Sequence, residues 1–231
     1  MTRSIVMVGN ESPAFAAFRS EALARVERVC CAFLPSRFDT PTPGPDKLDA
    51  APLGRELLFD LPSTSPLACH TLVLDIKNRC ERVSEFFLIF SPISLRTSIQ
   101  EAGVADIDRL CDDFIKSWLF LAREAVGLLS AQGSGKLCMV LTDEIAPSDE
   151  DEKPDIAGPL LSAAFKSMTD SLLGQSGPDV SIIAFGDHEH ARTNALAAYC
   201  FKILDEDRPA AAGKWHRAGR AGLFNPRKWN A

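Results

Sequence analysis

Short apolar runs alternate with helix-like segments along this chain, and this alternation limits the folds that it can adopt. The run SIVMV at residues 4–8 has the length of a buried strand and ends at Gly9. Ser12 and Pro13 then provide an N-cap and a first helical residue. A second apolar run, VCCAFL at 29–34, follows this helix. The start of the chain therefore predicts a β-α-β unit with parallel strands and a right-handed crossover.

The same alternation continues almost to the end of the chain. Further apolar runs predict strands at 55–60, 85–91, 136–141 and 179–186, and the segments between and after them predict helices at 64–82, 106–132, 158–173 and 190–205. This order predicts an α/β fold in which a single doubly wound parallel sheet, Rossmann-like, carries helices on both faces. With 231 residues, 46% of them hydrophobic, we expect one domain over residues 1–231.

Three segments fall outside this pattern. Residues 35–54 are rich in proline and predict an exposed loop, residues 143–157 form an acidic loop, and residues 207–231 form a basic tail. One interpretation is that the acidic and basic segments are simply solvated. The other is that the acidic loop of one subunit meets the basic tail of a neighbour.

Charge and hydropathy exclude several classes of function. The net charge of -6 disfavours nucleic acid and anionic lipid as partners. No apolar run approaches the ~18 residues that a membrane span needs, and no secretory signal is present, so we expect a cytoplasmic protein. The 7 cysteines lack C-x-x-C spacing, which favours reduced core thiols over disulfides or a zinc site.

The predicted helix at 106–132 is apolar on two sides. One set of apolar residues recurs at spacings of three and four, and Ile115, Leu119 and Val126 add a second face. A helix of this kind commonly lies between its own sheet and another subunit.

The order of elements resembles the short-chain dehydrogenase/reductase family over nearly the whole chain. The resemblance rests on GSGKLCMVLTD (133–143), SAAFKSMTDSLL (162–173) and PDVSIIAFG (178–186). It implies a nicotinamide dinucleotide at the carboxyl ends of the strands. It also implies a homodimer or homotetramer, or a heteromer with an active paralogue, built through helices 106–132 and 158–174.

The cofactor motifs of the family are altered here. In place of the T-G-x-x-x-G-x-G turn the chain has VGNESPAF, where Gly9 matches the first glycine, while Pro13 and Phe15 replace the next two. Glu11 adds a negative charge beside the expected diphosphate. The resemblance implies that Arg37 could accept a 2′-phosphate and that Asp60 could contact adenine; both residue types are also common in solvated or structural positions.

The catalytic motifs are altered as well. The family's serine corresponds to Thr142, and its asparagine falls near Ile115. The tyrosine and lysine of Y-x-x-x-K fall on Gly158 and Ser162 in one register, and on Ser162 and Lys166 in another. Neither register supplies a phenol, which is the group that exchanges a proton with the substrate.

Two further sets of side chains, one at 187–190 and one at Tyr199, could carry chemistry. His188 and His190, in the sequence DHEH, could bind a divalent metal, but a polar helix start explains them equally well, so no metal site is expected. Tyr199 is interpreted as a packing residue.

These patterns leave three functional hypotheses. The first is a relative of the short-chain reductases without dehydrogenase activity and without a cofactor, which acts as an oligomeric scaffold or regulatory subunit. The alternative is an NADP-dependent oxidoreductase that uses Thr142, Ser162 and Lys166 with Gly9, Arg37 and Asp60. The third is a module that binds another small ligand.

Overall fold

The computed structural model describes residues 3–34, 55–59, 61, 63–98, 100–142, 155–187, 193–206 and 212–218. Its core is a seven-stranded sheet in the order β3-β2-β1-β4-β5-β6-β7, with every neighbouring pair parallel. The strands are β1 (Ser4–Gly9), β2 (Arg28–Phe33), β3 (Glu56–Phe59), β4 (Glu85–Phe90), β5 (Lys136–Leu141), β6 (Ser181–Asp187) and β7 (Trp215–Ala218). The predicted doubly wound sheet is confirmed.

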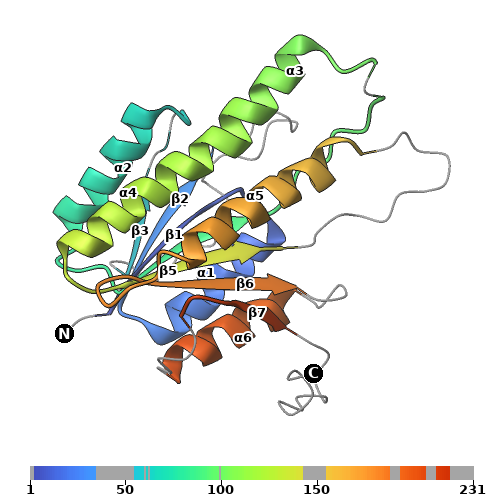
Figure 1. The fold of residues 1–231 in the computed structure, drawn as a ribbon. Coiled ribbons are helices and arrows are strands. Elements are labelled where there is room, and N and C mark those ends of the chain that lie inside the picture. Colours follow the sequence, from blue (N-terminus) through green and yellow to red (C-terminus); the bar gives the residue numbers. More distant parts are fainter. Residues whose placement is uncertain are drawn as a thin grey trace.

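Helices cover both faces of this sheet, as Figure 1 shows. They are α1 (Pro13–Arg25), α2 (Pro66–Arg79), α3 (Val104–Arg109), α4 (Ser117–Ala131), α5 (Ala157–Leu173) and α6 (Thr193–Asp205). Helices α2, α4 and α5 pack on one face with Val6 and Val8, and α1 and α6 pack on the other with Ile5 and Met7. This division follows from the period of two along a strand, which sends successive side chains to opposite faces.

The long helix predicted at 106–132 is present and contains an irregular segment. Residues Leu110–Lys116 are π-helical and join α3 to α4. A π-helical segment of this kind is uncommon and is often found beside functional sites.

A seventh strand, β7, lies inside the stretch that the sequence predicts as a basic tail. It spans only Trp215–Ala218 and pairs with β6 from Ala184 to Asp187. The prediction is wrong for these four residues because Trp-His-Arg-Ala has no apolar run or alternation of its own. Residues 35–54, 143–154 and 219–231 lie outside the described part of the chain.

No helix among the described residues is long and apolar enough to cross a membrane.

Candidate functional site

The turn after β1 is closed by the ring of Phe15. A Cβ placed on Gly9 would lie 2.6 Å from the carbonyl oxygen of Ile89 and 2.8 Å from Cδ2 of Phe15. Phe15 itself is 1% exposed, and its ring centroid lies 4.6 Å from that of Phe33. Gly9 is therefore required by the packing of β1 against β4 and α1, which leaves no open cradle at this position.

The start of α1 has few free donors for an anion. The Oγ of Ser12 accepts a hydrogen bond from the backbone N–H of Phe15 at 3.1 Å, and its carbonyl accepts from Ala16 at 3.0 Å. Pro13 has no N–H at all. In the first turn of α1, the N–H of Phe15 is therefore bonded and that of Pro13 is absent, so fewer donors face an anion than at an uncapped helix start.

The residues of this turn therefore do not fit a dinucleotide diphosphate in the place that the family resemblance implies. The ring of Phe15 takes the space, the Oγ of Ser12 bonds the N–H of Phe15, and the exposed Glu11 adds negative charge. A negative side chain beside a phosphate is repulsive at any realistic dielectric constant.

A line of hydroxyl groups crosses the carboxyl edge of the sheet next to this turn. The Oγ of Ser91 lies 3.0 Å from that of Ser12 and accepts a hydrogen bond of 3.0 Å from Oγ1 of Thr142. Asn10 donates to the carbonyl of Ser91 at 3.0 Å. Ser91 and Thr142 are buried. The three hydroxyls follow β1, β4 and β5, whose ends meet because the strands are parallel.

This hydroxyl line, Ser12, Ser91 and Thr142, can present hydrogen bonds to a polar ligand. The Oδ1 atom of Asn10 is buried and has no hydrogen-bond partner among the described residues, so one acceptor is left beside the line. No acid or base shares a hydrogen bond with these three hydroxyls in the described part of the chain. They can orient a ligand, but nothing here raises the nucleophilicity of a hydroxyl.

At the start of α5, Gly158 is one of the two positions to which the family's tyrosine can correspond, and Asp155 lies where its Cβ would be. Asp155 caps this helix: its Oδ1 accepts from the N–H groups of Ala157 at 3.0 Å and Gly158 at 3.1 Å, and also from Leu95 at 2.9 Å. A Cβ on Gly158 would collide with the Asp155 carboxylate and lie 3.4 Å from the carbonyl oxygen of Ile93. In the register that aligns the family's tyrosine with Gly158, this carboxylate lies where the Cβ of the tyrosine would be.

No hydrogen bond in the described part of the chain joins Thr142, Ser162 and Lys166 to one another. Thr142 bonds to Ser91 and to the carbonyl of Phe90, whereas Lys166 is exposed and donates to Asp170 at 2.7 Å. The Oγ of Ser162 is buried and has no partner among the described residues. That Thr142, Ser162 and Lys166 are catalytic residues remains a prediction.

The ammonium of Lys166 belongs to a surface cluster at the edge strand. It lies 5.8 Å from the ring centroid of Trp215, and the indole N–H donates to Asp170 at 2.5 Å. The hydrogen bonds from Lys166 and Trp215 lower the pKa of Asp170.

We expect Asp170→Asn to remove a stabilisation that depends on pH. Because the folded-state pKa lies below the unfolded value of ~3.9, this stabilisation is present above about pH 4 and lost as the pH falls through the folded value. Because the cluster is exposed, Asp170→Asn should lower the free energy of unfolding near neutral pH by less than about 1 kcal/mol. Urea unfolding at about pH 7 and about pH 3 measures it.

Asp112→Asn is the matched control, since it removes an exposed i,i+4 pair with Lys116 that has no tryptophan partner. A loss for Asp170→Asn that is the same at both pH values would contradict the assignment.

Several predicted site residues lie outside the described part of the chain, namely Arg37, Asp60, His188 and His190. Tyr199 lies in α6 and packs against the α1 side of the sheet, where burial raises its pKa. This face is opposite to the one that carries α4 and α5.

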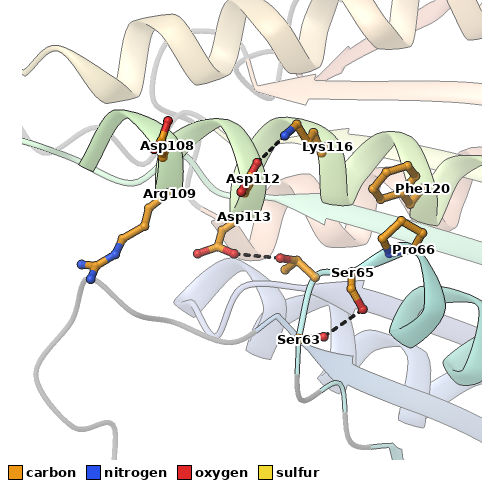
Figure 2. Close-up of a pocket in the computed structure, with 10 residues that line it drawn as sticks. Ser63, Ser65, Pro66, Asp108, Arg109, Asp112, Asp113, Lys116 and Phe120 are labelled. Carbon is orange, nitrogen blue, oxygen red and sulfur yellow. Dashed lines mark hydrogen bonds and ion pairs between the residues drawn. The ribbon is translucent and has the colours of Figure 1, made fainter. Parts of the chain in front are cut away.

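A cavity that the sequence pattern does not predict lies beside the π-helical segment, as Figure 2 shows. Its volume is about 530 Å³, and it lies between the start of α2 and residues 108–120. The buried Asp113 accepts a hydrogen bond of 2.7 Å from Thr64 at one wall. Its lining residues are Ser63, Thr64, Ser65, Pro66, Asp108, Arg109, Asp112, Asp113, Lys116 and Phe120.

This cavity carries hydroxyls, carboxylates and two cations, which suits hydrogen bonding to a small polar molecule. Part of its charge is already paired, since Lys116 donates to Asp112 at 2.5 Å. The helical pattern does not predict this cavity, because the helix carries other charged residues such as the exposed Asp108 and Asp112, and the burial of Asp113 is decided by packing.

Comparison with known proteins places the chain by fold. No protein-family model matches it, and no curated protein matches it by sequence. Among solved structures, it matches YwfH, an NADPH-dependent reductase involved in bacilysin biosynthesis, with a TM-score of 0.70 and 10% identity over 94% of this chain and 98% of that one. It matches a short-chain dehydrogenase from Mycobacterium smegmatis with a TM-score of 0.70 and 13% identity over 96% and 94% of the two chains.

A third match is the NADH-dependent reductase A1-R′ complexed with NAD, with a TM-score of 0.67 and 18% identity over 94% of each chain. At these identities the likeness shows the fold: this chain has the Rossmann-like fold of short-chain dehydrogenases and reductases.

Proposed function

We propose that this protein is a short-chain-reductase-like subunit that acts through assembly and does not carry out hydride transfer with a dinucleotide bound at the turn after β1. The observation that carries the proposal is the closure of that turn by Phe15, which is 1% exposed and packed on Gly9. The Asp155 cap over Gly158 supports it in the register that aligns Gly158 with the family's tyrosine, because the carboxylate lies where a Cβ would be.

The assembly surface is proposed on the outer side of α4 and α5, in a homodimer or homotetramer or in a heteromer with an active paralogue. Leu119 on α4 is 49% exposed and Leu160 on α5 is 56% exposed. Figure 1 shows these two helices side by side over the same face of the sheet. Large apolar side chains that share one exposed surface are typical of subunit contacts.

Light scattering on the purified chain tests the assembly. We expect a dimer or tetramer that dissociates toward monomer in Leu119→Glu and Leu160→Glu, because a buried unpaired carboxylate disfavours the contact. Leu67→Glu is the matched control: Leu67 is 73% exposed but lies on α2. A wild-type chain that is monomeric both alone and with a paralogue would contradict the proposal.

A second candidate is an NADP-dependent oxidoreductase with an atypical site, and the comparisons favour it over the first. YwfH and the Mycobacterium smegmatis protein, which share this fold, are named as a reductase and a dehydrogenase, and another structure with the fold is ElxO with NADP bound. Within the chain, the hydroxyl line next to the turn is the feature that favours it.

Titration with NADPH separates the two candidates, with the quenching of tryptophan fluorescence as the readout. The first candidate, a subunit without hydride transfer, predicts no saturable quenching up to millimolar NADPH. Saturable binding that is lost in Thr142→Val would support the oxidoreductase and overturn the first candidate.

A further inference from the structure

Two cysteines from distant parts of the chain meet inside the α2 side of the sheet. Cys30 lies in β2, and Cys80 is the residue that ends α2. Their sulfur atoms are 3.1 Å apart, although the residues are separated by 50 positions in the sequence. No other function described above uses either thiol.

Regular structure holds both cysteines in place. Cys30 is in register between Val6 of β1 and Leu57 of β3. The backbone N–H of Cys80 donates to the carbonyl of Ile76 at 2.8 Å, and Arg28 donates to the carbonyl of the neighbouring Arg79 at 3.0 Å. The approach of the two sulfurs therefore depends on the sheet and the helix end, which are the rigid parts of the fold.

The two thiols have different acidities. The hydrogen bond from Cys30 and the nearby Arg28 guanidinium lower the pKa of Cys80, whereas the hydrogen bond with Cys80 and burial raise the pKa of Cys30. Burial raises the pKa of Cys69, on the same face, to about 11. Cys80 is thus favoured as the thiolate, and its 4% exposure puts it at the boundary of the core, where a small oxidant has the shortest path.

We propose that Cys30 and Cys80 form a redox pair that hydrogen peroxide oxidises to an intramolecular disulfide. The Cys80 thiolate attacks one peroxide oxygen, the O–O bond breaks, and hydroxide leaves and takes a proton to become water. The Cys30 sulfur then attacks the Cys80 sulfenic acid, loses its proton, and a second water leaves as the S–S bond forms. Two thiols are oxidised and one peroxide is reduced to two waters.

The disulfide would join β2 to the end of α2 and enclose β3 and α2 in a covalent loop. A link across a loop of this length restricts the unfolded chain, so the oxidised protein should melt roughly 4 °C or more above the reduced protein. This inference is independent of the proposed assembly.

Peptide mapping of the full chain tests the proposal. The protein is reduced, treated with hydrogen peroxide, alkylated, and digested with trypsin without reduction. We expect the tryptic peptide 29–37 joined to the peptide 80–82, and fragmentation should place the bond at Cys30 and not at the adjacent Cys31. A Cys111→Ala background removes the exposed thiol that could bridge two chains.

Three variants provide the controls. Cys30→Ala and Cys80→Ala should abolish both the linked peptide and the rise in melting temperature. Cys31→Ala should keep both, because Cys31 lies on the same strand but faces the opposite side of the sheet. If any of these variants fails to fold, fragmentation of the linked peptides from the protein that keeps both cysteines still shows which cysteine is bonded to Cys80.

Either of two results would overturn the proposal: Cys80 recovered as an alkylated free thiol after the peroxide treatment, or a bond that fragmentation assigns to Cys31.

Discussion

Replacing Phe15 with alanine is expected to lower the free energy of unfolding by about 3–5 kcal/mol. The ring is 1% exposed, packs on Gly9 and Phe33, and belongs to the core between α1, α6 and the sheet. Its removal leaves a cavity that these neighbours cannot fill, because they are held by the strands and by α1. Urea unfolding of the variant and the wild type gives the difference.

Phe120→Ala is the matched control for this prediction. Phe120 is only partly buried and lines the cavity beside the π-helical segment, so its loss should cost clearly less. If Phe15→Ala cost under about 1 kcal/mol, the ring would lie outside the core and the turn after β1 would be open. The first candidate function would then lose its main support.

Replacing Trp118 with alanine is expected to cost about 3–5 kcal/mol as well. Trp118 is 1% exposed, and its ring meets the rings of Phe90 and Phe165 edge-on, each at 5.5 Å between centroids. Phe90 and Phe165 are themselves stacked at 4.8 Å. Through these three rings, α4 and α5 pack against the end of β4, beneath the proposed assembly surface.

Trp118→Phe distinguishes packing from hydrogen bonding at this position. The indole N–H of Trp118 has no hydrogen-bond partner among the described residues, so phenylalanine removes an unsatisfied donor along with some volume. We expect a cost below about 2 kcal/mol for this change. Equal losses for the two variants would show that the N–H has a partner and that the ring does not carry the effect.

The fold was largely predictable because each strand has a local signature. The apolar runs at 4–8 and 136–141 correspond closely to β1 and β5, and Ser12 with Pro13 marks the start of α1 correctly. A buried parallel strand needs a continuous apolar run, and such a run is visible without knowing its neighbours. The sequence does not predict strand β7, because this strand lies at the edge of the sheet, where only one of its four residues is buried and no apolar run is needed.

The candidate site was predictable only in part. Gly9 and Phe15 follow from the comparison with the family's glycine-rich turn, and Thr142 follows from the position of the family's serine at the end of a strand. The contacts of Ser91 with Ser12 and Thr142 join three strand ends far apart in the sequence. No local spacing encodes such contacts, because they depend on which strands are neighbours.

By itself, the sequence determined the order of strands and helices, the division of side chains between the two faces of the sheet, and the absence of a tyrosine at the start of α5. These properties follow from local periodicity and residue identity. Only the tertiary structure decided that Phe15 closes the turn, that Asp155 covers Gly158, and that Cys30 meets Cys80. Each of these contacts joins atoms on different parts of the chain, and those atoms come close together only when the helices and strands have packed.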